Sequence, residues 1–422
     1  MMTLAVLLII IVALFGIPLF IALGAGSLLA SYSSNIDPIV LLIEMERLAS
    51  QPSLVAIPLF TLTGVAMAKG GAPHRLIRLF NALVGWFPGG VAIVTIFSCA
   101  FFTAFTGASG VTIMALGGLL YPLLKIADYP ERFATGILTA SGSIGLLFPP
   151  SLVILLYAIV AKVNINELFL AGIFPGILLI VMLSIYSNYC GVKRTVTLQR
   201  FRWHVLGQAI KESAWDIVLP VIIIGSIFGG LITVAETAAV AAMYVLFVEC
   251  IIYKEINLTK DLPVILKDTA ILVGSILIIL GVALGLTNLL IDAQLPMQLL
   301  AFLESYVDTP LGFLILLNIF LLLTGSIMDI FSAIVVIVPL ILPLANRYGI
   351  DPVHLGIIFL ANLEIGYITP PVGLNLFIAS QRFGKPIMAL FRAAIPFLMI
   401  MLVWLMLITY VPELSLWWKT PS

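Results

Sequence analysis

The chain has 422 residues, of which 62% are hydrophobic and only 9% carry a charge, and its formal net charge is zero. A soluble domain is about half apolar and about a quarter charged, so this composition excludes a soluble protein and indicates one whose solvent is lipid. The neutral balance also argues against nucleic acid as a partner. Cys99, Cys190 and Cys250 lie singly in apolar runs, which argues against disulfides and against a cysteine metal site.

Apolar runs long enough to cross a bilayer as helices, roughly 20 residues each, fill most of the chain. The first run is predicted to be a retained helix, because it lacks the basic start and the small-residue cleavage site of a signal peptide. In the first half we predict helices at roughly 2–15, 17–32 and 52–68, an amphipathic segment near 71–85, an interrupted segment within 88–125, and further helices at 132–162 and 166–190.

The second half repeats this order of elements. There we predict helices at roughly 215–232, 236–253 and 270–290, an amphipathic segment near 292–308, an interrupted segment within 310–345, and further helices at 353–380 and 388–411. Each interrupted segment has a polar, glycine-containing tip, TGASG from Thr106 to Gly110 and TGSIMD from Thr324 to Asp329.

Two double-proline motifs reveal an internal repeat. GLLFPPS begins at Gly145 and GYITPPVG at Gly366, a separation of 366 − 145 = 221, and a separation of 218 pairs the two TG tips. Landmarks that recur in one order across most of a chain indicate a duplicated unit. We therefore predict repeat one over 1–190 (scaffold helices 1–85, hairpin and broken helix 86–162, closing helix 166–190), a basic cytoplasmic linker over 191–213, repeat two over 214–412 (scaffold helices 214–308, hairpin and broken helix 310–380, closing helix 388–411) and a periplasmic tail over 413–422.

The predicted fold class is an all-α integral membrane protein, an inverted repeat of five transmembrane helices plus one re-entrant hairpin per half. Hairpin arms of roughly 16–18 residues reach only about 24–27 Å, which favours hairpins that enter and leave on one side. Five crossings per half invert the halves, and with a periplasmic N-terminus sixteen Lys and Arg residues fall inside and four outside, as the positive-inside rule requires. Both termini are then periplasmic.

Helices broken at membrane depth need a purpose, because each unpaired backbone group in hydrocarbon costs several kcal/mol. Secondary transporters use such breaks: half-helix N-termini attract anions, and freed carbonyls and hydroxyls bind sodium. The alternative is that Gly and Pro only permit kinks and close packing. We predict sodium contacts at Thr106, Gly107, Ser109, Gly110, Gly142, Ser143, Gly145, Pro149, Gly325, Ser326, Gly366, Thr369, Pro370 and Gly373, and substrate contacts at Ser109, Asp329, Thr369 and Asn375.

Several acidic residues have competing interpretations. Asp329 at the second tip is predicted to take part in binding or coupling, or to cap the second arm as an N-cap. Glu364 is expected either to line a binding cradle or to pair with a basic residue. Glu236 follows Thr233 at the spacing of a capping box. Asp216 is read as an ordinary acid in the first turn of a helix.

The motifs that the chain lacks restrict its source of energy. It contains no GxxxxGK[ST] sequence, so it is not itself an ATP-driven motor. It contains neither HExxH nor GxSxG, and we predict that it is not an enzyme. Work done by this protein would have to be driven by an ion gradient, with sodium as the only metal ion.

At several of these segments the chain resembles the large, DctM-like membrane subunit of tripartite ATP-independent periplasmic (TRAP) transporters. The matching stretches are GASGVTIMALGGLLYPLL, YPERFATGILTASGSIGLLFPPS, AGIFPG, ITVAETAAVAAMY, MDIFSAIVVIVPLILP and GYITPPVGLNLF. The resemblance implies an elevator-type fold in the bacterial inner membrane, with Na+ as coupling ion. It also implies two partners, a small four-helix membrane subunit and a soluble periplasmic binding protein that delivers an organic acid.

The resemblance leaves the cargo open. C4-dicarboxylates, sialic acid, 2-oxo acids and sulfonates are all usual for this family. The tip GASG has fewer Ser and Asn residues than many relatives, and Phe148 stands in the first break where a smaller aliphatic residue is expected. The alternatives to sodium-coupled uptake are a passive anion channel and a stand-alone exporter with the same fold.

Overall fold

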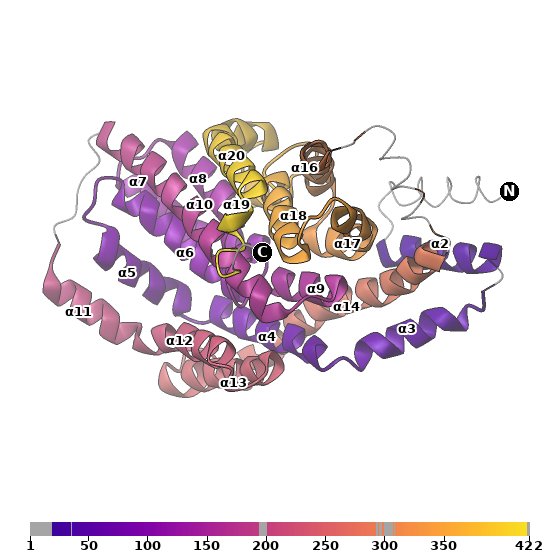
Figure 1. The fold of residues 1–422 in the computed structure, drawn as a ribbon. Coiled ribbons are helices and arrows are strands. Elements are labelled where there is room, and N and C mark those ends of the chain that lie inside the picture. The colour runs from indigo at the N-terminus through magenta and orange to yellow at the C-terminus, as the bar shows by residue number, and fades with distance from the viewer. Residues whose placement is uncertain are drawn as a thin grey trace.

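The computed structural model describes residues 19–34, 36–193, 201–292, 294, 298, 307 and 309–419, and this part of the chain contains helices and no strand (Figure 1). The predicted helix 2–15 and most of the predicted segment 292–308 lie outside the described residues. The elements are α2 (Leu19–Ser34), α3 (Ile39–Ala49), η1 (Pro52–Val55), α4 (Ala56–Lys69), α5 (Ala72–Val84), α6 (Gly90–Thr106), α7 (Ser109–Ile126), α8 (Glu131–Ser141), η2 (Ile144–Leu147), α9 (Leu152–Ala161), α10 (Ile165–Lys193), α11 (Trp203–Glu212), α12 (Ala214–Phe228), α13 (Val234–Phe247), η3 (Val248–Ile252), α14 (Asp261–Asp292), α16 (Pro310–Ile327), α17 (Ile330–Arg347), α18 (Pro352–Gly366), α19 (Leu374–Phe383), α20 (Ile387–Tyr410) and η4 (Pro412–Leu414).

Helices of membrane-spanning length dominate the described chain. Eight of those described are long and apolar enough to cross a bilayer, and nine if α8–η2 and α9, which meet at a 47° bend, count as one span. Their exposed surfaces carry many large apolar side chains, for example on α13 and α16, as expected where lipid is the solvent. The all-α, multi-pass membrane character predicted from the sequence is therefore confirmed.

After the predicted scaffold helices, both halves have the same order of elements. A helical hairpin (α6–α7 and α16–α17) is followed by a broken helix (α8–η2–α9 and α18–α19) and a closing helix (α10 and α20). The second hairpin arm begins at Ser109 in one half and at Ile330 in the other, a separation of 221 that matches the double-proline motifs. The TG tips, paired at 218 from the sequence, are therefore not equivalent positions. Thr106 ends α6, whereas Thr324 lies inside the last turns of α16, and the non-helical tip of the second hairpin is only Met328 and Asp329.

Each half packs its hairpin against both broken helices. In the first half α6 packs against α8 and η2, and in the second α16 packs against α18. The second arms cross over: α7 packs against α19 of the second half, and α17 packs against α9 of the first. Since α7 and α17, and α9 and α19, are equivalent elements, this exchange brings the two tips and the two breaks into one central region.

Short helices that the sequence did not predict lie around this centre. α3 follows α2, and α11 occupies part of the predicted linker 191–213. α14 begins nine residues before the predicted 270. Its first turns carry charged residues, which lower the hydropathy there, so hydropathy alone did not predict this part of the helix. In Figure 1, α3, α4, α5, α11, α12 and α13 lie along the lower side of the view, beneath the hairpins and the broken helices.

The predicted capping box at α13 is present. The Thr233 hydroxyl accepts a hydrogen bond from the Glu236 amide, and the Glu236 carboxylate accepts one from the Thr233 amide. Thr233→Ala is expected to lower the free energy of unfolding by about 1 kcal/mol, since one N-terminal amide loses its acceptor. Denaturation of the purified protein in detergent measures this cost. Thr233→Ser keeps the hydroxyl and should match the wild type; an equal loss in both variants would contradict the capping role.

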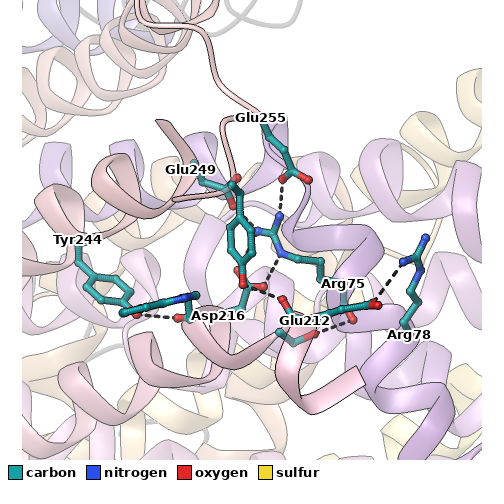
Figure 2. A network of polar contacts seen from close by, with 10 residues as sticks. Arg75, Arg78, Glu212, Asp216, Tyr244, Glu249 and Glu255 are labelled. Carbon is teal, nitrogen blue, oxygen red and sulfur yellow. Dashed lines mark hydrogen bonds and ion pairs between the residues drawn. The ribbon is translucent and has the colours of Figure 1, made fainter. Parts of the chain in front are cut away.

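A buried charge cluster ties α5 to α12 and η3 (Figure 2). Arg75 donates to Asp216 at 2.6 Å and to Glu249 at 2.5 Å, and it also binds Glu255. Its guanidinium lies 3.7 Å from the ring centroid of Tyr253. Asp216 lies in the first turn of α12, as expected, but it is buried there and pairs with an arginine from a helix about 140 residues earlier in the chain.

Candidate ion and substrate site

The first break lies against the first hairpin at contact distance. Between α8 and α9 the chain passes through η2 and the sequence Phe-Pro-Pro-Ser, in which the Pro149–Pro150 bond is cis. A Cβ on Gly145 would stand 2.1 Å from the carbonyl oxygen of Ala100 in α6. Only glycine permits this approach, which sets the freed backbone of the break directly beside the hairpin.

A layer of buried polar groups joins this break to the hairpin. The Thr103 hydroxyl donates to the Gly142 carbonyl at 2.8 Å and lies 2.7 Å from the Thr112 hydroxyl. From the other half, the Asn375 amide nitrogen approaches the Ser143 hydroxyl at 3.4 Å. The Asn375 Oδ1 is buried with no hydrogen-bond partner, as is the hydroxyl of Ser141. These oxygens remain available to a cation.

The second break meets its hairpin through two glycines. A Cβ on Gly366 would stand 2.4 Å from the backbone carbon of Gly325, so the two main chains touch. The Ser326 carbonyl accepts hydrogen bonds from the amides of Val372 and Gly373, both at 3.1 Å. Gly373 has a φ of +55°, which favours glycine. The Pro370–Pro371 bond is cis, like its counterpart.

Asp329 caps α17, as one of its two predicted roles requires. Its carboxylate accepts hydrogen bonds from the amide of Ser332, at 3.0 Å, and from the Ser332 hydroxyl. The neighbouring amide of Ile330 donates to the Tyr367 hydroxyl at 2.7 Å, which links the second tip to the end of α18. The N-terminus of α17 therefore already has a negative charge, whereas that of α7 has no side-chain cap.

A cavity of about 780 Å³ lies between the hairpins and the scaffold helices α4 and α14. Its walls include Gly107, Ser109 and Gly110 of the first tip and Asp329 of the second, so the structure brings both hairpin tips to one space. The remaining lining is mostly apolar and comes from Val65, Ala68, Lys69, Ala108, Val111, Met114, Ala115, Leu146, Asp268, Ile271, Leu272, Ile330, Phe331, Tyr367, Leu374, Ile378 and Gln381.

Other predicted site residues lie behind the cavity wall. Asn375 is fully buried against the first break, and the Thr369 hydroxyl donates to the Ile365 carbonyl in its own turn. Neither side chain lines the cavity, although both are predicted substrate contacts. The remaining predicted sodium contacts lie on the ends of the helices or on the breaks themselves: Thr106, Gly142, Ser143, Gly145, Pro149, Gly325, Ser326, Gly366, Pro370 and Gly373.

Glu364 has neither of the surroundings expected for it. It is fully buried in α18, and both carboxylate oxygens are without a hydrogen-bond donor. Among the described residues it forms no ion pair, and it does not line the cavity. Burying an ionised carboxyl without a cation or a hydrogen-bond donor is costly, so these surroundings favour the neutral form of Glu364.

Sequence reasoning missed three groups that the structure brings to the site. Thr103 and Thr112 flank the first tip at three-residue spacing from Thr106 and Ser109, and this spacing of hydroxyls along an apolar helix was a usable signal. Tyr367 lies inside the GYITPP motif but carried no signal for its bond to Ile330. That contact depends on how two consecutive helices, α17 and α18, pack against each other.

Comparison with known proteins gives a consistent family. The model of the family described as "Tripartite ATP-independent periplasmic transporter, DctM component" matches residues 4–414. The chain is 38% identical over 378 residues to the C4-dicarboxylate TRAP transporter large permease protein DctM of Pseudomonas aeruginosa, covering 89% of this chain and 88% of that protein. It is 33% identical over 368 residues to the sialic acid TRAP transporter large permease protein SiaM of Vibrio cholerae, covering 86% of this chain and 85% of that protein.

A solved structure shows the same fold at low sequence identity. The YdaH transporter of Alcanivorax borkumensis superposes with a TM-score of 0.60 at 15% identity, over 84% of each chain. This likeness bears on the arrangement of helices alone. Three relatives at 30–38% identity, two of them C4-dicarboxylate and one an ectoine TRAP transporter, are named large permease proteins rather than enzymes, in agreement with the prediction from the sequence. On the family match across nearly its whole length, the chain belongs to the DctM-component family of tripartite ATP-independent periplasmic transporters.

Proposed function

We propose that this protein imports an organic acid across the inner membrane, coupled to sodium, as the large permease of a three-part system. The observation that carries the proposal is the single cavity walled by both hairpin tips on one side and by scaffold helices on the other. The charge distribution supports an orientation with both termini in the periplasm. The hairpins and broken helices would move as one body against the scaffold, which is the elevator mechanism.

The residues at the first break fit sodium. Sodium is a hard cation that prefers oxygen ligands, and the break offers the Gly142 carbonyl, the Thr103 hydroxyl and the unpartnered Asn375 Oδ1. At the second break the candidate oxygens are backbone carbonyls between Gly366 and Gly373. A bound ion would supply the positive charge that an organic anion needs in an apolar cavity.

The chemistry of the relatives guides the choice of cargo. The two permeases named above and another at 35% identity carry C4-dicarboxylate or sialic acid in their names, both of which are carboxylic acids. A C4-dicarboxylate such as succinate is therefore the cargo to test first. A longer relative, the isethionate TRAP transporter permease protein DctMQ of Oleidesulfovibrio alaskensis, matches this chain over only 64% of its own length, which leaves room for a second subunit and supports the small membrane subunit as a partner. A periplasmic binding protein would complete the system.

Uptake by the reconstituted system tests the proposal. The complete chain is placed in liposomes with the small subunit, the periplasmic binding protein is added outside, and [14C]succinate uptake is followed with sodium or potassium outside. We expect uptake only with an inward sodium gradient and the binding protein. Conductance without either would favour a passive channel, and transport that ignores the binding protein would favour a stand-alone exporter.

Asn375 provides a sharper test of the first sodium site. Asn375→Leu removes the unpartnered Oδ1 while keeping the volume of the side chain, and we expect the sodium concentration for half-maximal uptake to rise roughly tenfold, because a charge–dipole contact of about 1.5 kcal/mol is lost. Sodium titration of [14C]succinate uptake measures it. Asn318→Leu removes a buried amide of α16 away from the break. An equal shift in both variants would contradict the assignment.

Asp329 can be separated into its two roles. Asp329→Asn keeps a capping oxygen for Ser332 but removes the charge, whereas Asp329→Ala removes both. If the charge takes part in coupling, the asparagine variant folds like the wild type but needs more sodium for half-maximal uptake. Normal sodium dependence in Asp329→Asn together with lowered stability in Asp329→Ala would leave capping as the only role.

A further inference from the structure

The scaffold wall of the cavity carries an ion pair that the proposed sodium and tip residues do not use. Lys69 ends α4, and its ammonium lies 2.5 Å from the carboxylate of Asp268 near the start of α14. Both side chains line the same cavity as Ser109 and Asp329. They are 38% and 41% exposed, so the pair is open to whatever enters the cavity.

Lys69 is the only positively charged side chain among the described residues that line the cavity. Among the described residues that line the cavity, the charged side chains are Lys69, Asp268 and Asp329, so the wall has one cation and two anions. Asp329 already accepts from the amide of Ser332 at the start of α17. An organic anion in this cavity therefore has a single side-chain cation to bind within the described lining, and Asp268 already occupies it.

The segment that follows Lys69 packs closely against the buried charge cluster around Arg75. Lys69 is followed by two glycines, and the positions that their Cβ atoms would take lie 2.5 Å from a carboxylate oxygen of Glu249 and 2.0 Å from one of Glu255. Both carboxylates bind Arg75 (Figure 2). Glycine at these positions lets the chain lie directly on the charge cluster, which fixes the backbone of Lys69 to the scaffold.

We propose that Lys69 binds a carboxylate of the transported acid on the scaffold side of the cavity, and that Asp268 competes with the acid for it. The inference rests on the proposed function. It assigns Lys69 as the side chain that binds the anion on the side of the cavity opposite the hairpin tips. Exchange is inexpensive because a half-exposed ion pair is weak and because one carboxylate replaces another. When the cargo has left, the Asp268 carboxylate pairs again with the Lys69 ammonium, which stays charged throughout.

The two members of the pair make opposite predictions for cargo affinity. In the reconstituted three-part system with [14C]succinate, Lys69→Gln is expected to raise KM roughly tenfold, since a charge-assisted contact is lost. Asp268→Asn removes the competitor and is expected to lower KM about threefold. A pair with only a structural role would respond in the same direction to both substitutions, because each breaks the same contact. Lys267→Gln, which changes an exposed neighbouring lysine outside the cavity lining, is the matched control and should keep the wild-type KM.

The possible results separate the inference from the function beneath it. Unchanged KM in Lys69→Gln, or a raised KM in both Lys69→Gln and Asp268→Asn, overturns the inference while uptake by the wild type upholds the proposed function. Absence of sodium-dependent uptake by the wild type overturns both. Thermal unfolding of each purified variant in detergent shows whether a change in KM comes with a loss of folded protein, and we expect melting temperatures close to that of the wild type.

Discussion

Replacement of Gly366 by valine is expected to reduce sodium-dependent uptake by about a hundredfold or more. Its Cβ would stand 2.4 Å from the backbone carbon of Gly325, so the second break and the second hairpin must separate. Moving the groups of a binding or reaction site by about 1 Å can reduce its rate by about a hundredfold. Overpacking should also lower the free energy of unfolding by about 1–3 kcal/mol.

The measurement is [14C]succinate uptake at saturating sodium, together with denaturation of the purified variant. Gly274→Val is the matched control, because a Cβ on Gly274 in α14 would meet nothing within 4 Å. It should transport like the wild type. Near-normal uptake by Gly366→Val would show that close contact between the tip and the break is not needed, and the sodium site assigned there would lose its geometric basis.

Replacement of Arg75 by methionine is expected to lower the free energy of unfolding by about 3–5 kcal/mol. The substitution leaves Asp216 and Glu249 buried without their cation, and side chains only 3% and 1% exposed have little access to water. Arg75→Lys should restore only part of the loss, because one ammonium cannot reach three carboxylates that a planar guanidinium binds together.

Arg78 on the same helix supplies the control for this prediction. It is 68% exposed and contacts one carboxylate, that of Glu212, at 3.3 Å, so Arg78→Met should cost less than about 1 kcal/mol. Urea denaturation in detergent, followed by intrinsic fluorescence, compares the variants. Equal costs for the two arginines would mean that the buried cluster does not hold α5 to α12 and η3.

Much of the fold followed from the sequence because lipid imposes strong rules. Apolar length predicted the closing helices at 166–190 and 388–411, close to α10 and α20. The double prolines predicted both breaks, since proline removes a backbone donor that a helix needs. Hydropathy failed for α3, α11 and the start of α14, where charged residues lie on helices.

The sequence indicated those site residues that lie in or next to a tip or break motif. It did not indicate residues that reach the site only through packing between distant segments. Ser109 and Asp329 reach the cavity from the tips, as their motifs indicated. The positions of Asn375 and Lys69 depend on which helices cross, and a single sequence does not show that α19 lies against the first half. The sequence also misaligned the two hairpin tips by three residues. The short TG motif recurs at a separation of 218, whereas the ends of α6 and α16, which define equivalent positions, are 221 residues apart.

Electron cryo-microscopy of the complete chain with its partners in a lipid nanodisc, recorded in sodium and in potassium, tests the central claim most directly. The account predicts that Pro149 and Pro370 both lie near mid-membrane beside the cavity, with density at the two breaks in sodium that is absent in potassium. A map that places both double-proline segments at the lipid headgroups, or breaks that look the same in the two salts, would contradict it.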